Sequence, residues 1–324
     1  MPIGWLQGRL LRAALLVKLK APVVWRVFAP ACVFSMWAAV LVSAWVFLTR
    51  TPPEDLWRAY PAAIEGFQQT PRGWLFLLRN GLEIPYCDGL NLNSDQRLEQ
   101  SDLETVLSQA YVPGEASLPV GAGKEPGRFR NYDLLKAAYG ATPDEVRRNL
   151  VTVDFCGLDV AFNVQNGAAA ALRDAAAALS ADPEAAAYVR LVAGKRLSAK
   201  RGGRLKRSPN ISSWYWRNIA GTQRLSAHSF GIALDLNKPN PTRPAYWRWV
   251  SLGRFPRGFE DVTALEPVSW RVIDIFEKHG FIWGGKWHHF DTMHFEYRPE
   301  FFASRRPQQA CEGGRQAHKE AWRP

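Results

Sequence analysis

An uncharged, mostly apolar stretch at 27–48 limits what this chain can fold into more than any other feature. As a helix rising about 1.5 Å per residue it would extend for about 33 Å, close to the hydrocarbon thickness of a bilayer. A buried helix of a water-soluble core is rarely so long and uncharged. We therefore expect an N-terminal transmembrane helix at 27–48.

Positive charge lies on one side of this stretch. The basic residues before it are Arg9, Arg12, Lys18, Lys20 and Arg26, and the first acidic residue of the chain is Glu54. Because positive charge is retained in the cytoplasm, residues 1–26 are predicted to be a basic cytoplasmic segment. The chain after 48 then lies on the outer, periplasmic side of the inner (cytoplasmic) membrane. A cleavable signal peptide, with Val42 and Ala44 before the cleavage site, is the alternative, and it gives the same location.

The net charge of +11 favours an anionic partner such as membrane lipid, nucleic acid or a cell-wall polymer. The sequence has no nucleic-acid-binding motif, so no nucleic acid partner is expected. The basic segment Lys195–Arg207 is interpreted as a solvated loop, and contact with an anionic polymer or lipid is the alternative. The 14 tryptophans either line a cleft or fill the core.

Three cysteines follow the predicted span, where disulfides persist. Cys311 lies in a polar tail, so Cys87–Cys156 is the preferred pair, although sequence alone leaves the pairing open. The chain has no Cys-x-x-Cys motif, so a cysteine-based zinc site is not supported.

Periodicity predicts a mixture of helices and short strands. The segment 51–71 is expected to be a linker that leads into short helical segments. Helices are expected at 98–110, 131–139, 143–149, 167–179, 183–193 and 267–279, and strands at 150–155, within 225–237 and at 294–297. Asn163 or Asn166 is expected to cap the helix at 167–179. A glycine-broken turn is expected at 281–287.

Two short segments combine metal-binding residue types. In the first, a turn at Gly231 would bring His228 and Asp235 to one ion. In the second, Asp291 and His294 are three residues apart, so one side chain can reach the ion while the other reaches its water. Two imidazoles and a carboxylate leave one zinc position open, which is typical of hydrolytic sites.

The motifs Ser226-x-His228, Gly231-x-Ala233-x-Asp235 and Asp291-x-x-His294 resemble those of VanY-like zinc D-alanyl-D-alanine carboxypeptidases and L-alanyl-D-glutamate endopeptidases, which cut peptidoglycan stem peptides. The segments at 219–222 and 283–287 match a bacterial branch of this group, and the resemblance covers about 166–299. It implies an α+β fold, in which a small antiparallel sheet carries a zinc site and is flanked by helices. It also implies that 151–304 is the catalytic domain, between an exported N-terminal region at 49–150 and a polar tail at 305–324.

The resemblance also implies roles for individual residues. His228, Asp235 and His294 would be the zinc ligands. Asp291 would take the place of the family's catalytic acidic residue, and Arg217 that of an arginine that stabilises the oxyanion.

Three further residues are expected to assist. Glu296 shares a strand face with His294 and would support that ligand. His289 would hydrogen-bond to the reaction intermediate, and Ser226 would hold the loop that carries the first ligand.

The predicted function is that of a membrane-anchored zinc metallopeptidase acting on peptidoglycan stem peptides. The alternative is a non-catalytic module that keeps the zinc fold and binds cell-wall peptides. A metal-dependent nuclease is disfavoured because no nuclease motif is present. The sequence leaves open which peptide bond is cut.

Overall fold

The computed structural model describes residues 52–109, 111–114, 124–193, 196–199, 205–208, 211–236 and 268–303. The chain divides into two compact units, 1–51 and 52–324. The predicted span at 27–48, the segment 1–26 and the tail at 305–324 lie outside the described residues. Within the described ranges, no helix combines the length and apolar character needed to cross a membrane.

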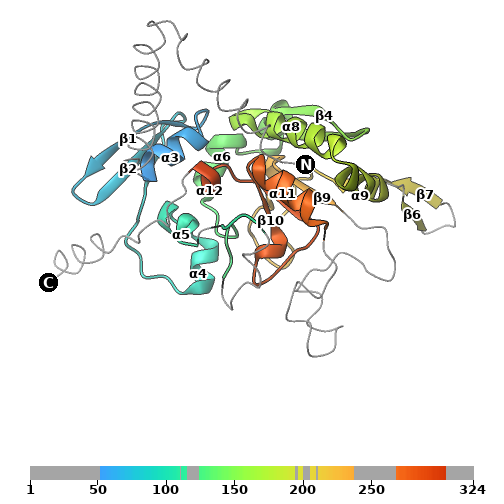
Figure 1. Cartoon of the computed structure of the whole chain (residues 1–324). Coiled ribbons are helices and arrows are strands. Elements are labelled where there is room, and N and C mark those ends of the chain that lie inside the picture. The colour runs from blue at the N-terminus through green and yellow to red at the C-terminus, as the bar shows by residue number, and fades with distance from the viewer. Residues whose placement is uncertain are drawn as a thin grey trace, which may run out of the picture. The chain divides into compact units, whose positions relative to one another are not determined.

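The described part of 52–324 is an α+β fold (Figure 1). Its helices are α3 (Pro52–Ala59), α4 (Ser94–Glu99), α5 (Leu103–Leu107), α6 (Tyr132–Tyr139), α7 (Pro143–Arg148), α8 (Ala168–Ala181), α9 (Pro183–Ala193), α11 (Trp270–Lys278) and α12 (Glu300–Ala303). Three short 3₁₀ turns accompany them, η2 (Gln165–Gly167), η3 (Ala227–Phe230) and η5 (Gly284–Lys286). The strands are β1 (Ile64–Thr70), β2 (Gly73–Leu78), β3 (Glu83–Pro85), β4 (Leu150–Phe155), β5 (Leu158–Asn163), β6 (Arg196–Ala199), β7 (Leu205–Ser208), β8 (Ile211–Ser212), β9 (Ala233–Leu236), β10 (Phe281–Trp283) and β11 (His294–Tyr297).

A four-stranded antiparallel sheet in the order β10-β11-β9-β8 forms the centre of the C-terminal part. In its register, His294 lies opposite Asp235 and Glu296 lies opposite Ala233. Directly opposed residues on neighbouring strands place their side chains on the same face of a sheet. The pairing of β9 with β11 therefore brings two of the predicted ligands together, as the motifs required.

Helix α11 covers this sheet with an apolar face, and α8 packs against both α11 and the β4–β5 hairpin. Val272, Ile273 and Phe276 of α11 are fully buried. The Phe276 ring stacks on Phe295 of β11 with 4.3 Å between centroids. Burying large aromatic side chains is a major source of folding free energy. The strand that carries His294 is thus fixed against a rigid layer.

The described residues of 52–150 are tied to the central sheet by buried polar contacts. Tyr60, just after α3, donates a hydrogen bond to Glu300 of α12 at 2.7 Å. Arg130 forms an ion pair with Glu296 of β11 at 2.5 Å. Buried charges are stable only when paired, so these contacts hold the N-terminal region in one position on the sheet.

Several local predictions need correction. The helix expected at 98–110 is broken into α4 and α5, because Asp102 caps a new helix by accepting from Thr105. The segment 51–71 holds one helix and then strand β1. The turn expected at 281–287 is strand β10 followed by η5, and the segment Lys195–Arg207 contains parts of the paired strands β6 and β7 instead of a simple loop.

Neither predicted asparagine caps α8. The helix starts after Gly167, which adopts φ 81° and offers no side-chain cap. Asn163 instead donates to the carbonyls of Tyr139 and Phe230, each at 3.0 Å. Asn166 donates to the carbonyl of Ala138. These carbonyls lie at the ends of α6 and η3, where main-chain acceptors lack helical partners, and both asparagines satisfy them instead of capping α8.

The preferred disulfide between Cys87 and Cys156 is wrong. Both residues are thiols. The Cys87 thiol contacts Glu104 at 3.4 Å, and the Cys156 thiol contacts the carbonyl of Ala176 in α8 at 3.6 Å. The two thiols therefore lie in different surroundings, whereas a disulfide needs Cα atoms within about 7 Å. Cys311 lies outside the described residues.

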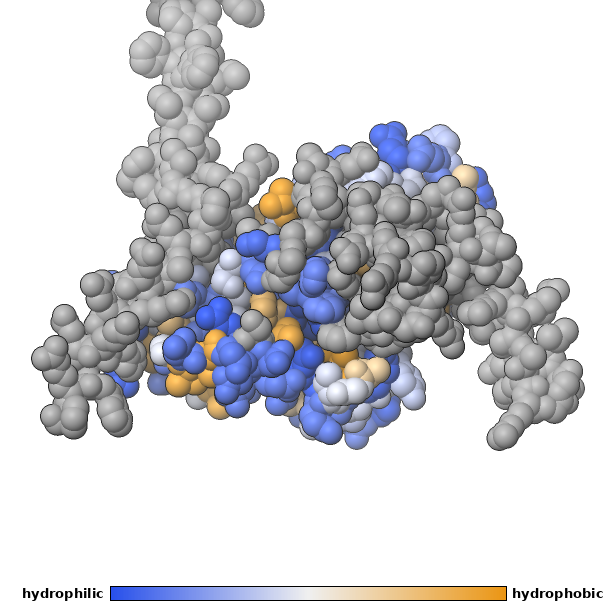
Figure 2. Space-filling view, turned by 90° about the horizontal axis from the view of Figure 1, so that it is seen from below, coloured by the Kyte–Doolittle hydropathy of each residue, from blue (hydrophilic) through white to orange (hydrophobic). Residues whose placement is uncertain are grey.

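The face shown in Figure 2 is mostly hydrophilic among the residues that it colours, with small hydrophobic patches between them. Among the described residues, the large exposed hydrophobic side chains are those of Trp57, Leu82, Leu90, Val112, Val164 and Tyr215, and they come from separate segments. Scattered apolar residues of this kind are normal on protein surfaces.

Candidate metal centre

The loop before β9 places the first predicted ligand. Ser226 caps η3 by accepting a hydrogen bond from the backbone of His228, as its predicted supporting role requires. The turn then closes at Gly231, which has φ 68°. A Cβ on Gly231 would lie 2.6 Å from Leu150 Cδ2, so both backbone conformation and space require glycine. The tight turn directs His228 back toward β9.

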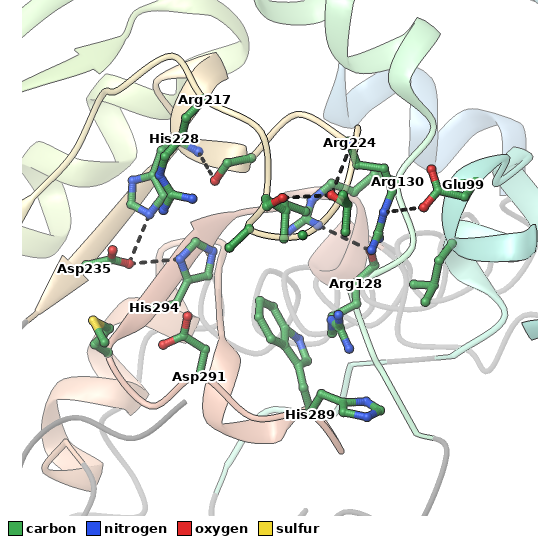
Figure 3. A pocket seen from close by; sticks show the side chains of 18 of the residues that line it. Glu99, Arg128, Arg130, Arg217, Arg224, His228, Asp235, His289, Asp291 and His294 are labelled. Carbon is green, nitrogen blue, oxygen red and sulfur yellow. Dashed lines mark hydrogen bonds and ion pairs between the residues drawn. The ribbon is translucent and has the colours of Figure 1, made fainter. Parts of the chain in front are cut away.

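The three predicted ligands converge on one point. His228 Nε2 lies 3.1 Å from Asp235 Oδ1, and His294 Nδ1 lies 3.0 Å from the same oxygen. One ligand atom from each residue lies within 4.8 Å of the others. Figure 3 shows both imidazole rings directed at the Asp235 carboxylate. Two imidazole nitrogens and a carboxylate oxygen so close together are a donor set that suits zinc.

The far nitrogens of both rings have fixed partners. His228 Nδ1 lies 2.6 Å from the carbonyl oxygen of Ser213, to which it donates when Nε2 carries the lone pair. His294 Nε2 lies 3.3 Å from Glu296 Oε2 and donates in the same way when Nδ1 carries the lone pair. Partners of this kind set the tautomer and orientation of metal-ligating histidines. The nitrogens that face Asp235 are therefore the ones available to an ion.

The Asp235 carboxylate interacts electrostatically with both histidines. Burial opposes ionisation of Asp235, but His228 and His294 outweigh it and hold the pKa of this carboxyl well below its usual range. Burial also opposes the charge on His294, while hydrogen bonds with Asp235 and Glu296 raise its pKa to about 10. A divalent cation would take the place of the His294 proton as the source of positive charge at the site.

Asp291 lies at the edge of the same cluster, just before β11. Its backbone N–H donates to Gly284 at 2.9 Å, and its carbonyl accepts from His294 at 3.2 Å. A Cβ on Gly284 would lie 2.6 Å from the Asp291 carbonyl oxygen, so this approach needs glycine. Gly284, in the motif at 283–287, thus allows Asp291 to sit beside the ligands.

The carboxyl group of Asp291 is buried and incompletely paired. Its Oδ1 has no hydrogen-bond partner within the described part of the chain. Burial, followed by repulsion from Asp235, raises the pKa of Asp291 to about 6. A buried oxygen without a partner is uncommon in proteins and indicates a missing water or ion beside it. This orphaned oxygen, together with the three-ligand set, fits a divalent metal with its own water.

A pocket of about 550 Å³ opens onto the cluster (Figure 3). The predicted site residues on its lining are Arg217, Ser226, His228, Asp235, His289, Asp291 and His294. The Arg217 side chain is exposed, and its guanidinium contacts the carbonyl of Asn218 at 3.4 Å. Among the described residues, Arg217 forms no ion pair.

Two predicted auxiliary residues have specific partners. His289, on the pocket lining, has its Nδ1 against Oε1 of Glu125, a residue of the N-terminal region. Glu296 is fully buried behind His294 and does not line the pocket. Arg130 and Arg298 hold Glu296 in place at 2.5 and 3.1 Å. Glu296 is thus placed to support His294, as its strand position predicted.

The sequence motifs missed part of the pocket. Three buried arginines also line it, Arg128, Arg130 and Arg224. Arg128 pairs with Glu125 and Arg130 pairs with Glu296, and both glutamates are buried. No local spacing pattern marks these arginines. Arg130, for example, pairs with Glu296, a residue 166 positions away in the sequence.

A second group of metal-type side chains occurs at Cys87, Asp102 and Glu104. Both oxygens of Asp102 are already engaged, because they accept from the backbone of Thr105 at 2.7 Å and of Asp88 at 3.0 Å. The Cys87 thiol contacts Glu104. This group is explained by helix capping and loop closure.

Three convergent side chains of metal-ligand type, a carboxylate beside them and a pocket form an arrangement that suits a metal-dependent hydrolase. Residues 220–297 match the family model described as D-alanyl-D-alanine carboxypeptidase. The matched segment includes all three predicted ligands and Asp291, so the family resemblance predicted from the motifs is confirmed and supports a peptidase. Comparison with curated proteins and with solved structures gives no match.

Proposed function

We propose that this protein is a zinc-dependent peptidase that hydrolyses an amide bond in peptidoglycan stem peptides. The observation that carries the proposal is the convergence of His228 Nε2, Asp235 Oδ1 and His294 Nδ1 beside the orphaned carboxyl oxygen of Asp291. The family match over 220–297 supports the substrate class.

His228, Asp235 and His294 would hold the zinc ion, and Asp291 would act on the water molecule beside it. When bound, zinc supplies Lewis acidity toward a water molecule and toward the scissile carbonyl. Asp291 takes the proton from the attacking water and returns it to the leaving amine.

Arg217 is proposed to offset the charge that develops on the carbonyl oxygen. Its exposed guanidinium lines the pocket near His228 (Figure 3). A cation beside that oxygen stabilises the transition state more than the substrate, which is the condition for accelerating the reaction.

A cleavage assay tests this function. The purified protein is incubated with peptidoglycan, with and without a chelator, and released D-alanine and stem fragments are measured. We expect zinc-dependent release by the native protein and a loss of about 10²- to 10⁴-fold in Asp291→Ala. Asp144→Asn, at an exposed position on α7, is the matched control and should retain full activity. Full zinc occupancy without cleavage would instead favour the non-catalytic binding module.

We further propose that residues 27–48 anchor the protein in the cytoplasmic membrane with the peptidase on the outer side. The uncharged stretch and the basic residues before it support this location. The protein should stay with the membrane fraction after alkaline extraction and be degraded by protease added to spheroplasts. Recovery in the soluble fraction, with an N-terminus after Ala44, would identify a cleaved signal peptide instead.

A further inference from the structure

Buried ionisable side chains occupy every second position from the start of β11. They are His294, Glu296, Arg298 and Glu300, and each is at most 6 % exposed. Apolar residues of similar volume often give a protein the same stability as buried charges, or more. Folding stability alone therefore does not account for this row of charges, which begins at a predicted zinc ligand.

Hydrogen bonds join the row from end to end. His294 Nε2 lies 3.3 Å from Glu296 Oε2. Arg298 donates from Nη1 to Glu296 Oε1 at 3.1 Å and from Nε to Glu300 Oε1 at 2.5 Å. Tyr60 donates from its hydroxyl to the other oxygen of Glu300 at 2.7 Å. A support path of four side chains, Tyr60, Glu300, Arg298 and Glu296, thus leads to His294.

The Glu296 carboxylate is held on both of its oxygens. Oε1 accepts from Arg130 Nε and from Arg298 Nη1, each at 3.1 Å. Oε2 accepts from Arg130 Nη2 at 2.5 Å and also faces His294. A carboxylate has about four acceptor positions, so these contacts fill them. The two arginines therefore fix the orientation of Glu296 and, through it, the orientation of the His294 ring.

Arg298 is held in turn by contacts on each of its nitrogens. Nη1 also donates to the carbonyl of Gly127 at 2.7 Å, and Nη2 donates to that of Phe129 at 3.3 Å. Nε depends on Glu300, whose second oxygen is held by Tyr60. Tyr60 follows α3, which packs against α12 (Figure 1). The far end of the support path is thus supplied by the N-terminal region.

Three members of the support path lie outside the family match at 220–297. Arg298 and Glu300 come directly after it, and Tyr60 lies 160 positions before its start. The match includes the three predicted ligands and Asp291. It therefore assigns no role to the side chains that hold Glu296 from the N-terminal side.

We propose that Tyr60, Glu300 and Arg298 are positioning residues for the zinc ligand His294 and act through Glu296. The inference rests on the proposed zinc site and adds a role for the N-terminal region, which supplies part of its support. Removing the hydrogen-bond partners of a metal-ligating histidine typically lowers metal affinity by about 10- to 100-fold. Zinc affinity should therefore respond to the Tyr60 hydroxyl, although three side chains lie between it and His294.

Tyr60→Phe is the first test, because it removes one hydroxyl and keeps the aromatic ring. The zinc dissociation constant of the full chain is measured by competition with a chelator of known affinity. We expect zinc binding to weaken by about 3- to 10-fold, less than for a direct partner of the histidine. The visible absorption of the cobalt-loaded protein should also change, since it reports the geometry of the ligands.

Tyr111→Phe is the matched control. Tyr111 is also buried and donates to a buried carboxylate, Glu277 of α11, at 2.5 Å. The other partners of that carboxylate are Gly114 and Lys286, which are not predicted ligands. Both substitutions should lower the urea midpoint by removing a buried hydrogen bond. Only Tyr60→Phe should change zinc affinity by more than about twofold.

A double substitution tests whether Arg298 transmits the effect. Arg298→Lys cannot hold both Glu296 and Glu300 in the same fork geometry, so we expect zinc binding to weaken by about 10- to 100-fold. Adding Tyr60→Phe to this variant should weaken binding by less than about twofold more, because the support path is already interrupted.

Native zinc affinity in Tyr60→Phe, or a loss equal to that of Tyr111→Phe, would overturn the proposal. If Tyr60→Phe or Arg298→Lys does not fold, the other variant decides. Cleavage of peptidoglycan is scored separately. Zinc affinity that responds to Tyr60 without cleavage would refute the peptidase and keep the positioning role, and cleavage with unchanged affinity would do the reverse. A native protein that binds no zinc would overturn both.

Discussion

The two sides of the pocket are built by different means. The metal side comes from neighbouring strands, where the β9–β11 register alone sets Asp235 opposite His294. The arginine side comes from separate segments and is held by buried ion pairs, among them Arg130 with Glu296. Hydrogen-bonded strands keep their register without side-chain charges, whereas a buried ion pair fails when either partner is lost. The metal side should therefore tolerate changes that the arginine side does not.

Removing the negative charge of Glu296, which contacts Arg130 on one side of the pocket and His294 on the other, should give the largest loss of stability. Glu296 is fully buried between Arg130 and Arg298, and these partners and His294 hold its pKa well below the usual range despite burial. Glu296→Gln leaves two buried guanidinium groups undercompensated. We expect a decrease of about 3–5 kcal/mol in the free energy of unfolding, measured by urea denaturation.

The control for this change is Glu65→Gln, at an exposed position of β1, which should alter stability by about 0.5 kcal/mol or less. If the two substitutions had equal, small effects, the Glu296 carboxylate would not stabilise the contact between the arginine side and the metal side.

A change within the metal side should affect activity more than stability. Gly284→Ala places a methyl group 2.6 Å from the Asp291 carbonyl oxygen and must displace that residue. Small displacements of catalytic groups cost on the order of 10²-fold in rate. We expect kcat to fall by about that factor while zinc content is kept.

Gly66→Ala provides the matched control, because a Cβ there meets no atom within 4 Å. It should retain native kcat. A native rate in Gly284→Ala would mean that the position of Asp291 does not limit the reaction.

The pH dependence of metal binding tests the coupling between Asp235 and His294. With the pKa of His294 raised to about 10, this ring carries a proton at neutral pH when no metal is bound, and that proton must leave before the ring binds an ion. Raising the pH makes the removal easier, so zinc affinity should rise with pH. We expect up to about tenfold per pH unit between about 7 and 9.

Calorimetry in buffers of different ionisation enthalpy would count the protons released on zinc binding. About one proton per ion is expected near pH 7 from His294. Affinity that does not change over this range would argue against a protonated His294 in the metal-free protein.

A surface ion pair should show the smallest effect. Arg147 and Asp144 pair on α7 with side chains 60 and 75 % exposed. Exposed pairs contribute little because water screens them, so Asp144→Asn should change stability by about 0.5 kcal/mol or less. A loss comparable to that of Glu296→Gln would remove the distinction between buried and exposed pairs.

The metal side was predictable from the sequence because its chemistry is local. His228, Gly231 and Asp235 lie within one loop and strand, and His294 lies three residues after Asp291. Residue types and alternation along a strand were enough to predict that these side chains share a site. The helices α6, α7, α9 and α11 also followed from periodicity.

The arginine side was not predictable because nothing local marks it. Arg130 and Glu296 are 166 positions apart, and no spacing rule connects them. The wrong Cys87–Cys156 pair failed for the same reason, since sequence separation says nothing about distance in space. Asn163 suited a helix cap by local rules, but its side chain instead donates hydrogen bonds to the carbonyls of Tyr139 and Phe230, which are distant in sequence.

The central claim is that one zinc ion is bound by His228, Asp235 and His294. Its most direct test is the zinc content of purified protein after exhaustive dialysis, measured by mass spectrometry for the native chain, for His294→Ala and for His279→Ala. His279 ends α11 with its Nδ1 on the carbonyl of Ile275, so it is a histidine control outside the cluster. We expect about one zinc per chain in the native protein and in His279→Ala, and less than about a tenth of that in His294→Ala. Native zinc content in His294→Ala would contradict the account.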